Sequence, residues 1–218
     1  MRSISFDVTR EFHEKAGFTF PHYVTTELGN YTKSSKNFVQ SLTHENQELA
    51  RSVKKITFMD RKTRKVVEVP KYLRENFKSG RKDIAFPLVD VSEPPMSCFV
   101  TKRKVQYSDL DLLQHVNSCI YIDWCMDAAC EAVARQKLAN FTHDLAEYRI
   151  QKIDMLFMSE CFALEEVEVS VWEKEGCKHT LLCEVSKTDA DGKKRRVTFC
   201  SLTFYPLSFG MPKIASKL

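Results

Sequence analysis

The sequence predicts an α+β fold in which a curved antiparallel sheet wraps around one long helix. Apolar residues recur at three- and four-residue spacings from about Asn117 to Leu138, which indicates a single long helix. One strand-like run precedes this helix and four more follow it. The last two runs are joined by Asp191-Gly192, a strong hairpin signal, so we expect an antiparallel sheet.

The second half of the chain holds the elements of this sheet. Val167, Val169 and Val171 alternate with polar residues, which is typical of a strand with one buried face. The helix is apolar over more than one stripe, and we therefore expect it to lie centrally against the sheet. The apolar helix residues are Cys119, Ile120, Tyr121, Trp124, Cys125, Met126, Ala128, Cys130, Ala132 and Val133. Strands are predicted at 98–107, 148–161, 164–174, 178–188 and 195–206.

The first half of the chain is predicted to be mostly strand, with no convincing long helix. A break is expected at residues 87–97, where Pro94 and Pro95 follow a polar stretch. We therefore predict two domains, residues 1–91 and residues 96–212. Strands of the first are expected at 4–8, 23–28, 36–43, 49–60 and 65–70, with a turn at 44–48.

The composition indicates a globular protein that can bury a core, because 43% of its 218 residues are hydrophobic and 28% are charged. A net charge of +4 is mild, and no nucleic-acid recognition motif is present, so we expect no nucleic-acid partner. The eight cysteines form no C-x-x-C pair, and most lie in apolar runs. We therefore expect buried free thiols in a reducing compartment, with neither a zinc site nor disulfides.

No apolar run is long enough to span a membrane, so no membrane span is expected. The first fifteen residues, MRSISFDVTREFHEK, lack the apolar core of a signal peptide and carry acids that a transit peptide normally lacks. These features favour a cytoplasmic location.

Residues 109–124, DLDLLQHVNSCIYIDW, place two acids, a histidine and an asparagine directly before the apolar helix. This pattern resembles the start of the hotdog-fold thioesterases. It is most similar to the acyl-acyl-carrier-protein thioesterases, which read D-L-D-x-N-Q-H-V-N-N-x-x-Y-x-x-W at this place. SEC at 159–161 resembles the R-E-C of that family, and residues 57–77 resemble the segment that closes its first hotdog unit.

Those enzymes are tandem double hotdogs, and the resemblance covers nearly the whole chain. It implies that residues 1–91 are a first hotdog unit without its N-terminal strand and helix. It also implies that residues 96–212 are the second unit, which carries the catalytic motif. A sheet left open in this way is expected to be sticky, so we expect the chain to dimerise or aggregate.

The resemblance implies an acyl thioester hydrolase that releases a free fatty acid from acyl-CoA or from acyl-acyl-carrier-protein. Asp111, His115 and Glu160 match the catalytic residues of the family. The resemblance implies Asp111 as the base or nucleophile, His115 to orient water or carry a proton, and Glu160 as a second base. The helix N-terminus supplies unpaired N–H groups, so the amides of Asn117, Ser118 and Cys119 are expected to polarise the thioester carbonyl. Trp124 is predicted to contact substrate, and no metal or cofactor is expected.

The pattern departs from the family at two places. Leu113 stands where the family has an asparagine whose amide is thought to polarise the substrate, and Ser118 stands where it has its second asparagine. These changes leave open a different class of function, a non-catalytic acyl-thioester binding protein that kept the fold. A hotdog dehydratase would need another His/Asp or His/Glu arrangement, for which the sequence has no motif.

The motif residues also have structural interpretations. Asp109, Asp111 and Asn117 could cap the helix, and His115 could be an ordinary buried histidine. Cys161, beside Glu160, could be a nucleophile paired with His115, although a core thiol is the more ordinary interpretation.

Twelve lysines and arginines occur between residues 51 and 82, against three acids. They could form a solvated face. The less ordinary interpretation is a docking surface for the phosphates of CoA or for an acidic carrier protein.

Overall fold

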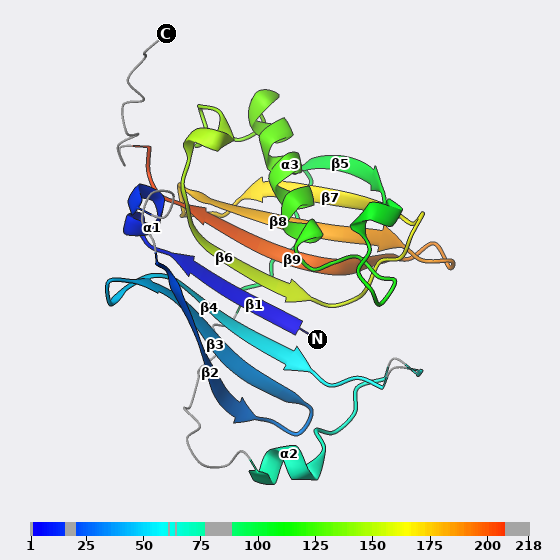
Figure 1. Ribbon diagram of the computed structural model, residues 1–218. Coiled ribbons are helices and arrows are strands. Elements are labelled where there is room, and N and C mark those ends of the chain that lie inside the picture. The colour runs from blue at the N-terminus through cyan, green and yellow to red at the C-terminus, as the bar shows by residue number, and fades with distance from the viewer. Residues whose placement is uncertain (1, 16–20, 61, 64, 77–88, 208–218) are drawn as a thin grey trace. The chain divides into compact units, whose positions relative to one another are not determined.

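The computed structural model describes residues 2–15, 21–60, 62–63, 65–76 and 89–207. The chain divides into two compact units, Met1–Leu88 (unit 1) and Val89–Leu218 (unit 2). Figure 1 labels the helices and strands of both. Among the described residues, no helix is long and apolar enough to cross a membrane.

Unit 1 is built around an antiparallel sheet with the strand order β2-β3-β4-β1. A two-residue turn, Glu45-Asn46, joins β3 to β4, and both residues have positive φ angles, as the tight hairpin turns with matching twist require. Its elements are β1 (Arg2–Val8), α1 (Arg10–Lys15), β2 (Tyr23–Tyr31), β3 (Ser35–His44), β4 (Gln47–Thr57) and α2 (Lys71–Asn76).

The prediction of a strand at residues 65–70 was wrong. This segment makes one isolated bridge, between Met59 and Val66, and then leads into α2. Val67 and Val69, which a strand would place on one face, differ in burial: Val67 is exposed and Val69 is buried. Both described helices of unit 1 have six residues, in agreement with the expected lack of a long helix.

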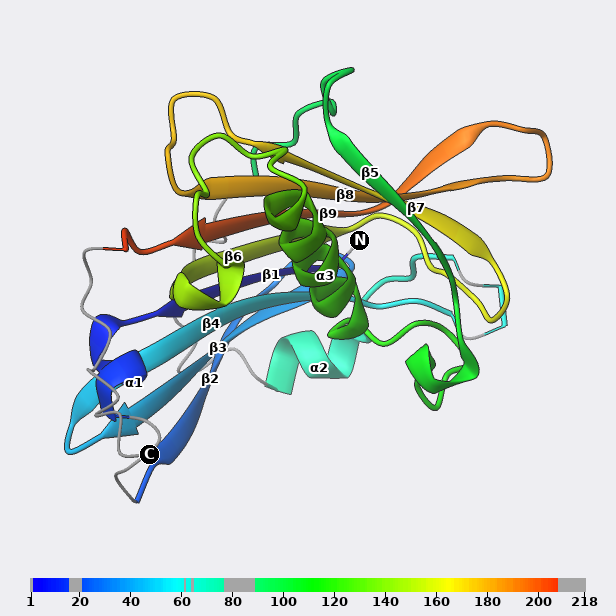
Figure 2. The ribbon, with the colours of Figure 1, turned by 90° about the horizontal axis from the view of Figure 1, so that it is seen from above.

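Unit 2 is a five-stranded antiparallel sheet with one long helix. The strand order is β6-β9-β8-β7-β5. Figures 1 and 2 show α3 lying across one face of this sheet. The elements are β5 (Phe99–Lys104), the 3-10 turn η1 (Tyr107–Asp109), α3 (Ile120–Ala134), the 3-10 turn η2 (Leu145–Glu147), β6 (Ile150–Phe157), β7 (Glu166–Glu173), β8 (Thr180–Thr188) and β9 (Lys194–Phe204).

One stripe of α3 is buried against the sheet. Val167, Val169 and Val171 of β7 are fully buried, as the alternation predicted. The other apolar residues of α3 do not share this burial: Cys119 and Cys130 are exposed, and Met126 and Val133 are half-buried. The expectation of a helix buried on more than one side was therefore wrong. The buried stripe consists of Tyr121, Trp124, Cys125, Ala128, Ala129 and Ala132.

The helix is also shorter than the predicted 117–138, and its C-terminus shows why. The N–H of Gln136 bonds to Val133 O and the N–H of Lys137 bonds to Ala132 O, which is the pattern of a Schellman cap. Gln136 stands at the left-handed position of this cap, with φ of 55°. Apolar spacing continues to Leu138 because that residue is buried after the helix has ended.

The segment predicted to be a break between domains packs on unit 2. Leu182 alternates along β8 with Cys183, which contacts Cys125 of α3, so Leu182 points to the opposite face. There it forms an apolar cluster with Trp172 and Phe199. Residues packed against this cluster include Val89, Val91 and Cys98.

All eight cysteines are free, as expected, but only half of them are buried. Cys125, Cys161, Cys183 and Cys200 are buried, and Cys98 is half-buried. Cys119, Cys130 and Cys177 are exposed, so the expectation of buried thiols was wrong for these three. Apolar patterning could not separate the two groups, because a cysteine on the outer side of α3 fits the same spacing.

Gln136→Gly is expected to stabilise the C-terminus of α3. Glycine occupies the left-handed region without the Cβ penalty, and Gln136 is exposed, so little packing is lost. We expect the free energy of unfolding in urea to rise by about 0.5–1 kcal/mol. Arg135→Gly is the control, because its φ of −89° needs no glycine, and it should lower stability. Equal effects of the two variants would contradict the assignment of the cap.

Candidate functional site

A tight turn of the backbone brings Asp111 and His115 together. Leu110 and Val116 form an isolated antiparallel bridge, and inside it the N–H of Asp111 bonds to His115 O at 2.9 Å. The turn closes through Gln114, which has φ of 62° and donates its N–H to Asp111 O. The two motif residues are therefore opposite each other on a hairpin-like turn before the helix. They do not lie on a helix face, although their spacing of four residues would also fit one.

His115 lies between two carboxylates. Its Nδ1 atom is 3.3 Å from Asp111 Oδ2, and its Nε2 atom is 3.8 Å from Glu160 Oε1. The imidazole is buried, with 6% of its side chain exposed, whereas the carboxylates keep 29% (Asp111) and 27% (Glu160) of theirs. We call these three side chains the Asp111–His115–Glu160 cluster. Residues far apart in sequence thus converge on one partly accessible point.

Glu160 reaches His115 because the loop after β6 pairs with the turn. The N–H of Val116 bonds to Cys161 O at 2.9 Å, so the residues that precede this pair, His115 and Glu160, become neighbours. At the same residue, the N–H of Cys161 donates to the hydroxyl of Tyr121 on α3. Two loops and the helix start are therefore joined at the backbone of Cys161.

Two of the three amides expected to polarise a carbonyl are already bonded. The N–H of Asn117 donates to Asp109 O, and the N–H of Cys119 donates to the side-chain oxygen of Asn117. Within the part of the chain that the structure describes, the Ser118 N–H has no such acceptor. Of these three amides, the one of Ser118 is therefore available to a substrate.

The predicted substrate-contacting residues have very different exposures. Asn117 and Cys119 are exposed and Ser118 is half-buried, so all three are accessible beside the helix start. Trp124, one turn further, is 3% exposed and packs edge-on against Tyr121 at 5.3 Å between ring centroids. Trp124 thus lies among core side chains in this structure.

The alternative interpretation, in which the motif residues are only caps, fits Asp109 and Asn117. Asp109 accepts the N–H of Gln106 and closes η1, which is a local structural contact. Asn117 caps the turn before α3 through the N–H of Cys119. Asp111 has a structural contact and also belongs to the cluster. Its Oδ1 accepts the N–H of Leu113 at 2.7 Å, and its Oδ2 faces His115.

Leu113 contacts the cluster through its backbone: its N–H donates to Asp111, and its side chain is 50% exposed. Leu112 in the same turn is 99% exposed, and Phe162 and Leu164 in the loop after β6 are also exposed. Exposed apolar side chains therefore occur on both loops that carry the cluster, and an asparagine at residue 113 would have offered an amide there.

Cys161 is poorly suited to be a nucleophile. It is fully buried, and burial raises the pKa of its thiol to about 11, with the neighbouring Lys187 acting in the opposite direction. A thiol attacks as its thiolate, so a cysteine with such a pKa is almost entirely protonated near neutral pH.

Lys187, Glu165 and Tyr121 contact the loop that carries Glu160, and sequence reasoning missed all three as site residues. Lys187 donates to Glu160 O at 2.8 Å and to both oxygens of Glu165. Their contacts join segments 22 to 40 residues apart in sequence, so no local spacing could have indicated them. Tyr121 was visible only as one member of the apolar helix pattern.

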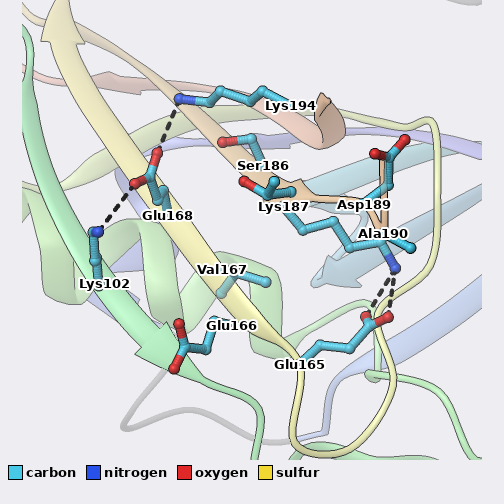
Figure 3. Close-up of a pocket in the computed structure, with 11 residues that line it drawn as sticks. Lys102, Glu165, Glu166, Val167, Glu168, Ser186, Lys187, Asp189, Ala190 and Lys194 are labelled. Atoms are coloured by element: carbon cyan, nitrogen blue, oxygen red, sulfur yellow. Dashed lines mark hydrogen bonds and ion pairs between the residues drawn. The ribbon is translucent and has the colours of Figure 1, made fainter. Parts of the chain in front are cut away.

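A pocket of about 450 Å³ opens at the ends of β7 and β8, beside the β8–β9 hairpin (Figure 3). Charged side chains line most of it, and Lys187 and Lys194 pair there with Glu165 and Glu168. None of the three residues of the Asp111–His115–Glu160 cluster is among its lining residues. Such a charged lining does not suit a fatty acyl chain.

The cluster has the components of general acid–base chemistry: a histidine that can carry a proton and two carboxylates within reach of it. In the described ranges, no group of three or more His, Cys, Asp or Glu side chains is placed to hold a metal ion. The chemistry available from these side chains is proton transfer.

Comparison with known proteins gives the context of this site. The family model for the acyl-ACP thioesterase C-terminal domain matches residues 92–200, which include the turn, α3 and the Glu160 loop. No curated protein sequence matches the chain significantly.

Two solved structures are similar over most of the chain. One is an acyl-ACP thioesterase from Bacteroides thetaiotaomicron, with 16% sequence identity and a TM-score of 0.63; the match covers 93% of this chain and 74% of that one. Another is the 12:0-ACP thioesterase from Umbellularia californica, with 13% identity and a TM-score of 0.69; the match covers 94% and 74%. At these identities the similarity establishes a shared fold.

Cys161 is expected to resist alkylation at pH 7.5, because its thiol is buried and fewer than about one in a thousand of such thiols would be ionised. A short pulse of iodoacetamide followed by peptide mass spectrometry should label the exposed Cys119 and Cys177 first. Labelling in denaturant is the control, and there Cys119, Cys161 and Cys177 should react alike. Rapid labelling of Cys161 in the folded protein would reopen its role as a nucleophile.

Proposed function

The chain belongs to the acyl-ACP thioesterase family and is a thioester hydrolase, and we propose that it releases fatty acids from acyl-carrier-protein or CoA thioesters by attack of water. The observation that carries this proposal is the position of His115, buried between Asp111 and Glu160 at the entrance to α3. We also propose that the two units are tandem hotdog units, in line with the similarity of nearly the whole chain to solved thioesterases.

The exposed apolar side chains of the two loops that carry the cluster support an apolar acyl substrate. Leu112 and Leu113 belong to the turn before α3, and Phe162 and Leu164 belong to the loop after β6. Several large apolar side chains exposed on two paired loops are typical of a binding surface. A charged cluster on such loops fits a substrate that joins a polar thioester to a hydrocarbon chain.

We assign Glu160 as the base and Asp111 as the residue that orients His115. Both oxygens of Asp111 are engaged, one by the N–H of Leu113 and one by the imidazole, which suits an orienting carboxylate. Glu160 lies on the Nε2 side of His115 and takes the proton of the attacking water. The water oxygen bonds to the carbonyl carbon, and the carbonyl oxygen becomes anionic.

The second half of the reaction breaks the C–S bond. The Ser118 N–H, at the positive end of α3, is the donor we assign to the anionic oxygen. When the C–S bond breaks, the proton held by Glu160 passes through His115 to the leaving sulfur. The products are a free fatty acid and the free thiol of the carrier, and no other reactant is consumed.

Asp111→Asn and Glu160→Gln are each expected to lower kcat by about 10²- to 10⁴-fold, because the first removes the carboxylate that orients His115 and the second removes the base, while each keeps the shape of the side chain. Asp109→Asn is the matched control. Asp109 lies two residues before Asp111 but caps η1, so the kcat of this variant should stay close to that of the unmodified chain. Free thiol released from a long-chain acyl thioester is the measured quantity. Full turnover in both site variants would show that the assignment is wrong.

A non-catalytic acyl-thioester binding protein is the second candidate, and Leu113 is the residue that favours it. A protein of this kind should bind acyl-CoA tightly and release no thiol over hours at high protein concentration. Leu113→Asn tests the difference, since a gain in turnover of tenfold or more would show that the missing amide limits the reaction. Turnover by the unmodified chain would exclude this candidate.

We propose the carrier-protein ester as the physiological substrate, because the basic residues of unit 1 suit an acidic partner. Within residues 51–82, Arg61, Arg64, Lys78, Arg81 and Lys82 lie outside the described residues. Several others are already paired with acids: Arg51 with Glu48, Lys71 with Glu75, and Arg74 with Glu68. Lys62 and Lys65 are exposed and are not paired in this way.

Reversing both charges, Lys62→Glu with Lys65→Glu, is expected to lower kcat/KM for acyl-acyl-carrier-protein by about tenfold at low salt and to leave kcat unchanged. The control substrate is an acyl-N-acetylcysteamine thioester, which carries no phosphate and should be hydrolysed equally by both proteins. An unchanged kcat/KM on the carrier-protein ester would remove this surface from the proposal.

A further inference from the structure

The peptide unit between Glu160 and Cys161 is held by two side chains from different elements. Its carbonyl accepts Lys187 Nζ of β8 at 2.8 Å, and its N–H donates to Tyr121 Oη of α3 at 3.2 Å. A peptide group held at both its oxygen and its nitrogen cannot rotate about the chain. The direction in which the Glu160 side chain leaves the backbone is therefore fixed from outside the loop.

Lys187 is fully occupied in this arrangement. Besides Glu160 O, its ammonium contacts both oxygens of Glu165 at 2.8 and 2.9 Å, which accounts for its three N–H donors (Figure 3). Only 15% of its side chain is exposed. A lysine with three acceptors and little exposure has no donor left for a substrate, so an effect on catalysis would have to pass through the loop.

Glu165 completes the restraint from the end of the same loop. Its Oε2 atom also accepts the N–H of Phe162, and the Phe162 ring lies 5.6 Å from Lys187 Nζ. The two ends of the loop, Glu160 and Glu165, are thus connected through the ammonium group of Lys187. Burial raises the pKa of the Tyr121 phenol, so the hydroxyl stays protonated while its oxygen accepts the Cys161 N–H.

We infer that Lys187 and Tyr121 are positioning residues, which hold the Glu160–Cys161 peptide so that the Glu160 carboxylate faces His115 Nε2. This inference rests on the proposed role of Glu160 and extends it to two residues that contact neither His115 nor the reacting atoms. The distance between Glu160 Oε1 and His115 Nε2 is set by a lysine on β8 and a tyrosine on α3, and not by the loop alone.

The test is the kinetics of Lys187→Met, which keeps an unbranched side chain and removes all three donors. We expect kcat to fall at least tenfold and KM to change less than twofold, because Glu160 is misaligned while substrate contacts persist. Lys187→Arg should recover kcat to within about threefold of the unmodified chain. Lys194→Met is the matched control: Lys194 also pairs with a glutamate in the pocket of Figure 3 but does not touch Glu160, so kcat should not change.

A double-variant comparison separates positioning from general destabilisation. If Lys187 acts through Glu160, Lys187→Met should have almost no further effect on the residual rate of Glu160→Gln, measured with excess enzyme. An equal loss in both backgrounds, or full kcat in Lys187→Met, would overturn the inference. Should Lys187→Met fail to fold, Tyr121→Phe decides, since it keeps the buried ring and should lower kcat about three- to tenfold; unchanged kcat would overturn the inference.

Failure of this inference is distinguishable from failure of the proposed function. A large effect of Glu160→Gln with none from Lys187→Met and Tyr121→Phe removes only the positioning residues. No effect of Glu160→Gln removes Glu160 itself from the mechanism, and the inference with it.

Discussion

The site depends on one backbone hydrogen bond, from the N–H of Val116 to Cys161 O. It joins a turn before α3 to a loop after β6, more than forty residues later in the sequence. His115 precedes Val116 and Glu160 precedes Cys161, so this pairing places an imidazole beside a carboxylate. Neighbouring backbone bonds, from Leu164 N–H to Val105 O and from Val105 N–H to Glu165 O, extend the pairing to the end of β5 and hold the two loops in register.

Burying His115 has an energetic cost that its surroundings reduce only on one side of the ring, because a polar ring removed from water needs partners. Nδ1 lies 3.3 Å from Asp111 Oδ2 and 3.4 Å from Val116 O, whereas Nε2, at 3.8 Å from Glu160 Oε1, has no hydrogen-bond partner among the described residues. Because Asp111 and Glu160 keep about a quarter of their surface, they are not charges isolated in a core. The cluster therefore lies at the boundary between the core and solvent, where a substrate can reach it and where the imidazole is still oriented.

The Lys187–Glu165 pair connects the loop that carries Glu160 to the sheet. Lys187 lies near the end of β8, one residue beyond the last pair of β8 with β7, and its backbone pairs with Arg195 of β9. Its ammonium bonds to the carbonyl of Glu160 and to the carboxylate of Glu165, so both ends of the loop are connected to this strand. Tyr121 contacts the loop from α3, whose buried stripe packs against the sheet. The loop carrying Glu160 is thus held by β8 and α3.

Local patterns of the sequence indicated most elements of unit 2 and the residues of the motif. Alternation indicated β7, the Asp-Gly pair indicated the β8–β9 hairpin, and the order of residues 109–117 indicated the acids and the histidine that we propose for the site. Residues 65–70 and the outer cysteines of α3 fit such patterns too. Whether they are buried depends on neighbours that periodicity does not contain.

The packed chain was needed to see that Asp111 and His115 face each other across a turn, that two of three helix-start amides are already bonded, and that Lys187 and Tyr121 hold the peptide of Glu160. Contacts of this kind join residues distant in the chain, and their geometry is set by how loops meet when the sheet and helix pack together.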